Sequence, residues 1–324
     1  MERLSEGAAD AALSAVLPLR AGNHRDGRDL ARAELLFQSL RRFAPPGLFA
    51  RILVVTPPDE VSMARAALAE WDDLALEFVA ETDLVPEFQH YPTVSGWTKQ
   101  QLVKLAASRR VETSFYLTFD ADVVCTHPID RERLLPGGQA LLQAEPKSVH
   151  RDWWLASAKM LGVPPRIEEA GMSVTPALLS AGACRGLIET LDGRAGRASW
   201  ADYLMRPHRR RALHHLRPGY RRRYRWTEYA LYFLYCRERG LLSELHAPAG
   251  SEEVPQTLIS AASVWSETPF ESWDPSLVFS DRDPALFCVV QSNKEQDPAA
   301  IEARIAGYLA PPPQDTASAG PDVT

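Results

Sequence analysis

Short apolar runs alternate with amphipathic stretches along the first part of the chain. Uninterrupted apolar runs bounded by polar, Pro or Gly residues predict strands in the interior of a sheet. Such runs lie at residues 14–20, 49–55, 74–79 and 114–119. Apolar residues at helical spacing between them predict helices at residues 26–43, 59–71 and 97–109. This alternation predicts an α/β fold with a mostly parallel, doubly wound sheet flanked by helices.

After these elements the pattern is less regular, although apolar runs and helical periodicities still recur. Further strands are predicted at residues 139–144, 172–174, 277–279 and 286–291. Further helices are predicted at residues 152–161, 175–191 and 298–309, and from Thr227 onward. No internal repeat or linker divides the chain, so one domain over residues 13–310 is favoured. Residues 1–12 are expected to be frayed, and the Pro-, Ala-, Ser- and Thr-rich residues 311–324 to be disordered.

Composition narrows the class of protein. The chain has 324 residues, of which 45% are hydrophobic and 24% charged, as in soluble globular proteins with a sizeable core. A net charge of −6 argues against general nucleic-acid binding. The four cysteines are far apart and are expected to be reduced and packed. No apolar run could span a bilayer and no secretory signal is evident, so a cytoplasmic location is expected.

Two acids, Asp120 and Asp122, end the apolar run at residues 114–119. Because strand side chains alternate in direction, the two carboxylates are expected to face one pocket. Such a pair is costly without a positive partner, and its oxygens suit a divalent cation. The carboxyl end of a strand is also where open α/β sheets bind ligands. The alternative is that both acids are surface or turn-forming residues.

Several segments carry a family resemblance. Tyr116–Val124 resembles the DxD motif of GT-A-type glycosyltransferases, in which two acids hold Mn²⁺ or Mg²⁺ against the diphosphate of a nucleotide-sugar. Gly96–Leu105, Trp226–Tyr229 and Phe287–Ser292 are similar to an uncharacterised bacterial glycosyltransferase-like family. The resemblance covers residues 14–309. It implies a single GT-A-like (Rossmann-like) domain, and an enzyme that moves a sugar from a nucleotide-diphosphate sugar to an acceptor. The acceptor is not identified by the sequence; an anionic glycan and a lipid-linked molecule are the candidates.

In this interpretation Mn²⁺ or Mg²⁺ is the cofactor, because a bound cation can neutralise the charge that develops on a leaving diphosphate. Asp122 is the expected direct metal ligand. Asp120 is expected to bind the ion through water or to reach the donor ribose. Two alternative functions remain open: a nucleotidyltransferase on a related fold, and a catalytically silent binding protein that retains the fold.

Three polar residues near the predicted ends of elements are candidates for contact with the donor. Lys99 and Gln100 lie near the N-terminus of the predicted helix 97–109, which itself attracts anions. Arg20 follows the first strand and is expected to touch the base or diphosphate. Gln101 and Lys104 on the same helix are explained at least equally well as a solvated face.

Glu228 is the candidate general base or acceptor ligand. Thr227 fits an N-cap, which places Glu228 in the first helical turn. A general base needs only to reach the acceptor hydroxyl and to have a suitable pKa. A carboxylate in the first turn of a helix is also stabilised by the helix dipole, so both a functional and a purely structural role stay open.

Other aromatic and basic residues are open to two interpretations each. His150, Trp153 and Trp154 either line an acceptor site or belong to the core. His246 is interpreted as a structural histidine. Residues 206–225 contain nine arginines and three histidines, and form either a solvated loop or a surface for an anionic acceptor or the inner membrane. No nucleic-acid-binding module accompanies this basic stretch, so nucleic acid is not an expected partner.

Overall fold

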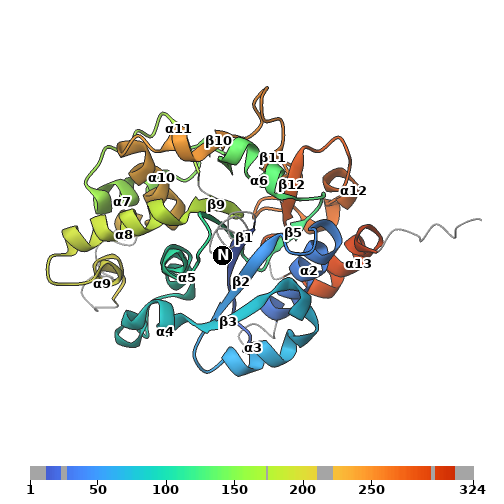
Figure 1. The fold of residues 1–324 in the computed structure, drawn as a ribbon, viewed down its shortest axis with the longest axis horizontal. Helices are drawn as coiled ribbons and strands as arrows, with labels where there is room; N and C mark the ends of the chain where they lie inside the picture. Colours follow the sequence, from blue (N-terminus) through green and yellow to red (C-terminus); the bar gives the residue numbers. More distant parts are fainter. Residues whose placement is uncertain (1–11, 23–27, 173, 210–221, 293–295, 311–324) are drawn as a thin grey trace, which may run out of the picture.

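A five-stranded sheet forms the centre of the protein (Figure 1). The computed structural model describes residues 12–22, 28–172, 174–209, 222–292 and 296–310. The strand order is β3-β2-β1-β4-β9. The first four strands in the chain are parallel: β1 (Leu13–Pro18), β2 (Phe49–Thr56), β3 (Leu76–Ala80) and β4 (Phe115–Thr118). β9 (Ala177–Ser180) runs antiparallel to β4. The predicted α/β class with a mostly parallel sheet is confirmed.

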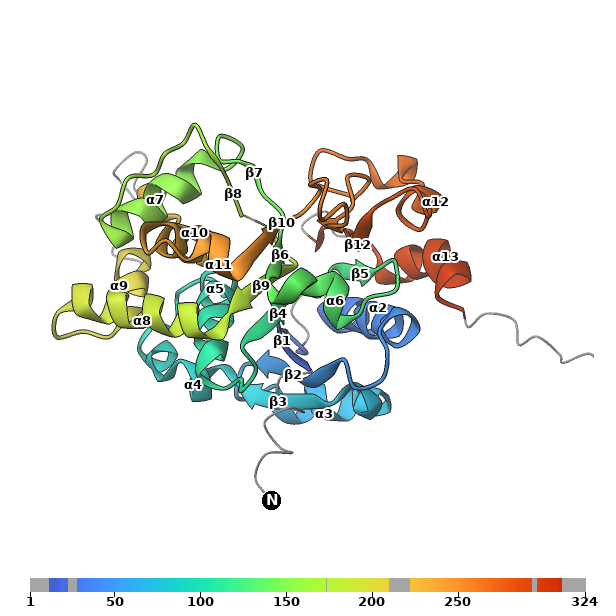
Figure 2. The same ribbon diagram turned by 45° about the horizontal axis from the view of Figure 1, so that its top comes forward.

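Both faces of this sheet are buried, as the near-continuous apolar strands require. In β1, Ala15 and Leu17 belong to one apolar cluster, whereas Val16 belongs to another. The cluster around Val16 includes helices α5 (Gly96–Ala106), α8 (Ala181–Ala195) and α10 (Glu228–Glu238), and the opposite cluster includes α2 (Arg28–Phe43). Figures 1 and 2 show these helices on opposite sides of the sheet. The period of two along each strand therefore produces the doubly wound arrangement.

A smaller three-stranded sheet brings the C-terminal part of the chain to the end of β4. β5 (Val123–Cys125) pairs antiparallel with β12 (Ala285–Val289), which pairs parallel with β11 (Thr257–Ile259). Just beyond these strands, the Val290 N–H donates to the Asp122 carbonyl oxygen at 2.9 Å. The residues that follow β12 are thereby held against the turn that carries the two acids.

Shorter elements complete the described part of the chain. The remaining helices are α3 (Val61–Ala67), α4 (Glu81–Leu84), α6 (Arg131–Leu134), α7 (Arg151–Leu161), α9 (Trp200–Met205), α11 (Leu242–Leu245), α12 (Pro275–Val278) and α13 (Pro298–Leu309). The remaining strands are β6 (Ala140–Leu142), β7 (Glu145–Pro146), β8 (Ala170–Gly171) and β10 (His246–Pro248).

One predicted helix is partly a strand. Residues 175–191 were expected to be helical, but Ala177–Ser180 form β9 and the helix α8 begins only at Ala181. All four residues of β9 are buried, and a short buried apolar run has no periodicity that separates strand from helix. The Ser180 hydroxyl accepts the Ala183 N–H and caps α8, so the helix cannot begin earlier.

A second prediction is also wrong, because the strand expected at residues 277–279 is the short helix α12. Asp274 caps this helix and Pro275 occupies its first turn, two local signals that outweigh the apolar pair after them. The helix expected at 59–71 is α3, followed by the 3₁₀ helix Ala69–Leu74. The predictions for residues 1–11, 173 and 311–324 fall outside the described residues.

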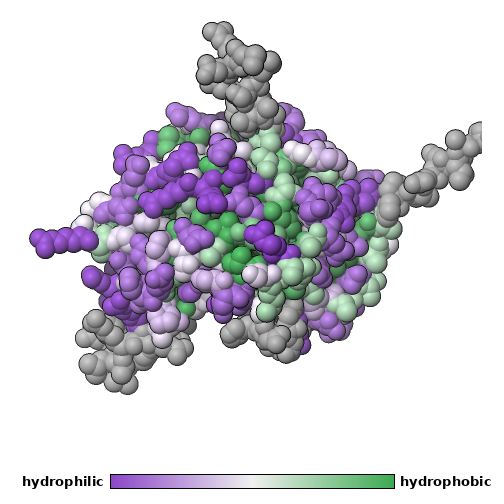
Figure 3. All heavy atoms as spheres, turned by 60° about the horizontal axis from the view of Figure 1, so that its bottom comes forward, coloured by the Kyte–Doolittle hydropathy of each residue, from purple (hydrophilic) through white to green (hydrophobic). Residues whose placement is uncertain are grey.

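The surface drawn in Figure 3 is mostly polar, as expected from the share of charged residues in the sequence. Seen from the side that lies at the bottom of Figure 1, most of the face is hydrophilic and apolar residues gather near its centre (Figure 3). Within the described residues, no helix has the length and apolar content needed to cross a bilayer. The four cysteines are free and buried, as predicted.

Candidate active site

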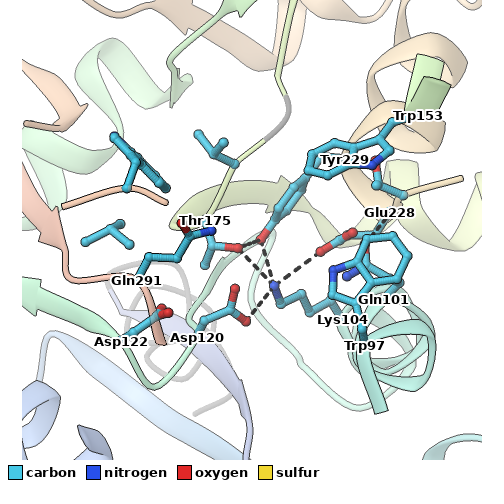
Figure 4. A pocket seen from close by; sticks show the side chains of 14 residues that line it. Trp97, Gln101, Lys104, Asp120, Asp122, Trp153, Thr175, Glu228, Tyr229 and Gln291 are labelled. Atoms are coloured by element: carbon cyan, nitrogen blue, oxygen red, sulfur yellow. Dashed lines mark hydrogen bonds and ion pairs between the residues drawn. The ribbon is translucent and has the colours of Figure 1, made fainter. Parts of the chain in front are cut away.

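Two adjoining cavities open at the carboxyl ends of β1 and β4. The larger cavity, of about 750 Å³, is lined by residues of the loop after β1 and of the start of α5. The smaller cavity, of about 140 Å³, is lined by residues of α5, α7 and α10 (Figure 4). Five residues line both: Trp97, Asp120, Asp122, Trp153 and Gln291.

Asp120 and Asp122 face both cavities together, as their spacing predicted. The reason differs from the prediction, because β4 ends at Thr118 and both acids lie in the turn before β5. Strand alternation therefore does not bring them together. The turn is held by the Val290 N–H bond to the Asp122 carbonyl and by pairing of β5 with β12.

Asp122 is half-buried, and its carboxylate is held by a backbone group. Its Oδ2 accepts the Ser292 N–H at 2.8 Å. Burial and the nearby charge of Asp120 raise the pKa of Asp122 to about 6, against the opposing effects of Ser292 and Arg32. Arg32 is itself buried and donates to the carbonyl oxygens of Val290 and Gln296 at 2.9 and 2.8 Å. Its charge therefore lies behind Asp122 and lines neither cavity.

Lys104 contacts four polar side chains in the lining of the smaller cavity. Its side chain is buried, and Nζ lies 2.8 Å from Asp120 Oδ1 and 3.2 Å from Glu228 Oε1. It also donates to Thr175 Oγ1 at 3.0 Å and to the Tyr229 hydroxyl at 3.2 Å. Burial opposes its charge, but these partners raise the pKa of Lys104 well above the ordinary value.

The interpretation of Lys104 and Gln101 as a solvated helix face is therefore wrong. Both side chains are buried, and both line the smaller cavity with Trp97. These three residues are spaced i, i+4 and i+7, which places them on one face of α5. That spacing is the signal in the sequence that could have identified them.

Glu228 begins α10 and is almost fully buried, with 1% of its surface exposed. The Thr227 hydroxyl accepts the Ala230 N–H, so the predicted N-cap is confirmed. Burial raises the pKa of Glu228, whereas Lys104 lowers it. Its Oε2 is buried and has no hydrogen-bond partner among the described residues. The carboxylate therefore faces the cavity with unused hydrogen-bonding capacity.

Tyr229 links the two sides of the smaller cavity and was not predicted from the sequence. Its hydroxyl lies 2.7 Å from Thr118 Oγ1 and 2.8 Å from Thr175 Oγ1. Thr118 donates in turn to the Ala177 carbonyl oxygen of β9 at 2.9 Å. This chain of hydrogen bonds ties α10 and Lys104 to the end of β4. No local sequence pattern distinguishes these hydroxyls from ordinary polar residues.

The aromatic candidates separate into cavity and core. Trp153 lines both cavities, with its ring 6.2 Å from that of Trp97, and His150 stacks on it at 3.8 Å. The Arg225 guanidinium lies 5.5 and 5.7 Å from the Trp97 and Trp153 rings and lines the larger cavity. Trp154 is fully buried in the core.

The donor-contact candidates are also separated by the fold. Arg20 and Gln100 line the larger cavity, where Arg20 lies 3.6 Å from Glu60. Lys99 lines neither cavity, because its ammonium pairs with Glu81 and lies over the Phe88 ring at 4.9 Å. The structure therefore does not bring Lys99 to the other candidates.

His246 lies in the core, away from both cavities. Its Nε2 lies 2.8 Å from the Tyr232 hydroxyl, and its Nδ1 lies 3.2 Å from the Ala140 carbonyl oxygen. These partners satisfy both ring nitrogens, in agreement with a structural role. Most of the basic stretch, residues 210–221, falls outside the described residues, so its predicted role is not tested.

The oxygen atoms at the junction of the two cavities suit a hard divalent cation. Asp120 and Asp122 supply the carboxylate oxygens. Within that part of the chain, no group of three or more His, Cys, Asp or Glu side chains could hold a metal. Mg²⁺ needs no such group, since it is commonly bound by one or two carboxylates with water and substrate phosphates.

Comparison with known protein families shows which family the chain belongs to. Residues 10–311 match the model of a family of unknown function (DUF6492). The chain belongs to this family. No curated protein matches the chain.

Solved structures similar to this family member include glycosyltransferases, as the sequence predicted. Mouse xyloside xylosyltransferase 1 is 14% identical over 87% of this chain and 98% of its own, with a TM-score of 0.48. Glucosyl-3-phosphoglycerate synthase from Mycobacterium tuberculosis, solved with Mn²⁺ and UDP, is 16% identical over 55% of this chain and 60% of its own, at 0.33. The galactosyltransferase LgtC is 12% identical over 66% and 84%, at 0.35. At these identities and TM-scores the matches assign no activity.

Proposed function

We propose that the protein is a metal-dependent glycosyltransferase that moves a sugar from a nucleotide-diphosphate sugar to a glycan or lipid-linked acceptor. One observation carries the proposal: Asp120 and Asp122 line both cavities at once. A cation bound by these two acids would face a nucleotide diphosphate in the larger cavity and a sugar in the smaller one. The bond to be broken, between sugar and diphosphate, would then lie at the junction.

The larger cavity has groups that suit a diphosphate beside a bound cation. Arg20 and Arg225 line it together with Asp29, Asp120 and Asp122, so the cation is needed to offset the carboxylates. Ser95 and Gly96, also part of its lining, form the N-terminal end of α5, where free N–H groups and the helix dipole favour anions. The volume of about 750 Å³ is in the range of pockets that hold drug-sized ligands.

The two acids would hold the cation unequally. Asp120 already has the Lys104 ammonium as its partner at 2.8 Å, so Asp122 is the direct ligand. Asp120 would bind through water or reach the ribose. A bound Mn²⁺ or Mg²⁺ supplies charge that stabilises the leaving diphosphate.

Residues of the chain itself supply the remaining chemistry. Glu228 can accept a hydrogen bond or a proton from a sugar hydroxyl, since its Oε2 is unpartnered among the described residues. Tyr229 and Thr175 hold Lys104 in place, and Lys104 in turn orients Glu228. We place the protein in the cytoplasm, with peripheral membrane contact where the acceptor is lipid-linked.

Thermal unfolding with UDP, GDP or ADP, each with and without Mn²⁺, tests this function. At least one nucleotide should raise the melting temperature only when Mn²⁺ is present. Asp122→Asn should remove that increase, whereas Asp72→Asn, a matched change at an exposed acid, should keep it. An increase that persists in Asp122→Asn would contradict the proposal. In turnover assays, release of nucleoside diphosphate supports sugar transfer, and release of pyrophosphate would identify a nucleotidyltransferase instead.

A further inference from the structure

The smaller cavity has hydrogen-bond acceptors without donors. Glu228 Oε2 and Gln291 Oε1 are buried and have no partner among the described residues. Both side chains line the cavity, from opposite sides in Figure 4. Buried acceptors without donors are unfavourable, so a ligand that fits this cavity should supply N–H or O–H groups.

The same cavity has an excess of negative charge. Three carboxylates line it, those of Asp120, Asp122 and Glu228, against the single ammonium of Lys104. An ammonium has three N–H donors, and Lys104 already has four polar neighbours. Lys104 therefore has no donor left for another anion. Arg32 partly offsets Asp122 from behind the cavity, and one negative charge remains in excess.

Three tryptophans complete the walls: Trp97, Trp153 and Trp265. Their indole rings add apolar surface beside the polar groups, and Trp97 is 37% exposed, although His150 stacks on Trp153 and Arg225 lies near the Trp97 and Trp153 rings. A pyranose ring has the matching character, with C–H groups on its faces and hydroxyl donors at its edge. A cavity that combines aromatic walls with a few convergent acceptors suits such a molecule.

We propose that the smaller cavity binds the transferred sugar as a neutral, hydroxyl-rich pyranose and rejects sugars that carry a carboxylate. Glu228 and Gln291 accept hydrogen bonds from its hydroxyls. This inference rests on the proposed function, in which the nucleotide diphosphate occupies the larger cavity. The positive charge of the bound cation is then offset by the diphosphate. A carboxylate on the sugar would therefore be repelled by the excess negative charge of the smaller cavity.

Calorimetric titration in Mn²⁺ tests the inference with two matched pairs of donors. UDP-glucose and UDP-glucuronate differ only in the group on C6, as do GDP-mannose and GDP-mannuronate. UDP and GDP alone serve as references. In the pair whose nucleotide binds, the neutral sugar should bind at least tenfold more tightly than its uronate. Equal binding of the two sugars, with the nucleotide bound, would overturn this inference alone. Failure of every nucleotide diphosphate to bind would overturn the proposed function with it.

A charge change in the cavity provides a second measurement. Gln291→Lys replaces the hydrogen-bond-accepting side-chain amide with an ammonium. The preference for the neutral sugar over its uronate should therefore fall at least fivefold or reverse. The preference is a ratio within one variant, so a change in nucleotide affinity cancels. Gln89→Lys adds the same charge at an exposed position and should leave the ratio unchanged. An unchanged ratio in Gln291→Lys would refute the placement of the sugar.

Discussion

The ammonium of Lys104 lies 2.8 Å from a carboxylate oxygen of Asp120, so the first acid of the pair has its own counter-ion inside the protein. Asp122 forms no such ion pair with the residues that the structure describes; it is held by the Ser292 N–H, and its pKa is raised to about 6. Two acids that look equivalent in the sequence are therefore different in the structure. Asp122 gains more from a cation.

Removal of the Lys104 charge should destabilise the protein strongly. Lys104→Met leaves Asp120 and Glu228 without their shared partner, and loss of one member of a buried pair costs about 3–5 kcal/mol. Urea unfolding should show this loss, whereas Lys159→Met, at an exposed position where only a contact with the Tyr224 ring is lost, should change stability by about 1 kcal/mol or less. If the double variant Lys104→Met/Glu228→Gln recovers none of the stability, Glu228 is not energetically coupled to Lys104.

Neutralisation of Glu228 should separate turnover from nucleotide binding. Glu228→Gln keeps the shape of the side chain but cannot accept a proton, so sugar transfer should fall by about 100-fold or more. Nucleotide diphosphate with Mn²⁺ should bind as in the wild type, because Glu228 lines only the smaller cavity. Glu244→Gln, at an exposed helix position, is the matched control. Full activity in Glu228→Gln would exclude Glu228 from the reaction.

His246 should make stability depend on pH. Burial lowers its pKa from 6.5 to about 4. Below pH 6.5 the unfolded chain takes up a proton that the folded protein does not, so stability falls as the pH drops from 6.5 towards 4. One pKa unit corresponds to about 1.4 kcal/mol, so the loss should approach about 3 kcal/mol. Urea unfolding at pH 7.5 and 4.5 measures it.

The contribution of His246 is isolated by comparing two substitutions. His246→Gln should unfold with a smaller pH dependence over this range, because the titrating group is gone. His90→Gln, at an exposed position, should retain the dependence of the wild type. The same pH dependence in both variants would show that other groups are responsible.

Two glycines should respond oppositely to alanine. A Cβ on Gly171 would lie 2.4 Å from Trp154 Cη2, in the core beside the active site, so Gly171→Ala should cost about 1–3 kcal/mol through overpacking. A Cβ on Gly193, inside α8, meets no atom within 4 Å. Gly193→Ala should therefore stabilise by about 0.5–1 kcal/mol, since alanine favours helix. Thermal unfolding of both variants tests the packing around Trp154.

Local patterns in the sequence were enough to predict most of the central sheet and part of the site. The apolar runs that became β1, β2 and β4 are visible without the fold because these strands are largely buried on both faces, and the run of the half-buried edge strand β3 is apolar enough to be recognised as well. Thr227 could be recognised as an N-cap, since capping depends on residues within one turn. The same locality made Asp120 and Asp122 candidates, for they are two residues apart.

Only the tertiary structure decided which residues surround these acids. Lys104 meets Asp120, Thr175 and Glu228, which come from three different segments, and no periodicity connects positions so far apart. β9 becomes a strand because β4 offers it an antiparallel edge, although its own apolar run fits a helix equally well. Gln291 and Ser292 reach the acids because β12 pairs with β5. Periodicity within a segment reports burial of a face, whereas long-range pairing selects the partner that covers it.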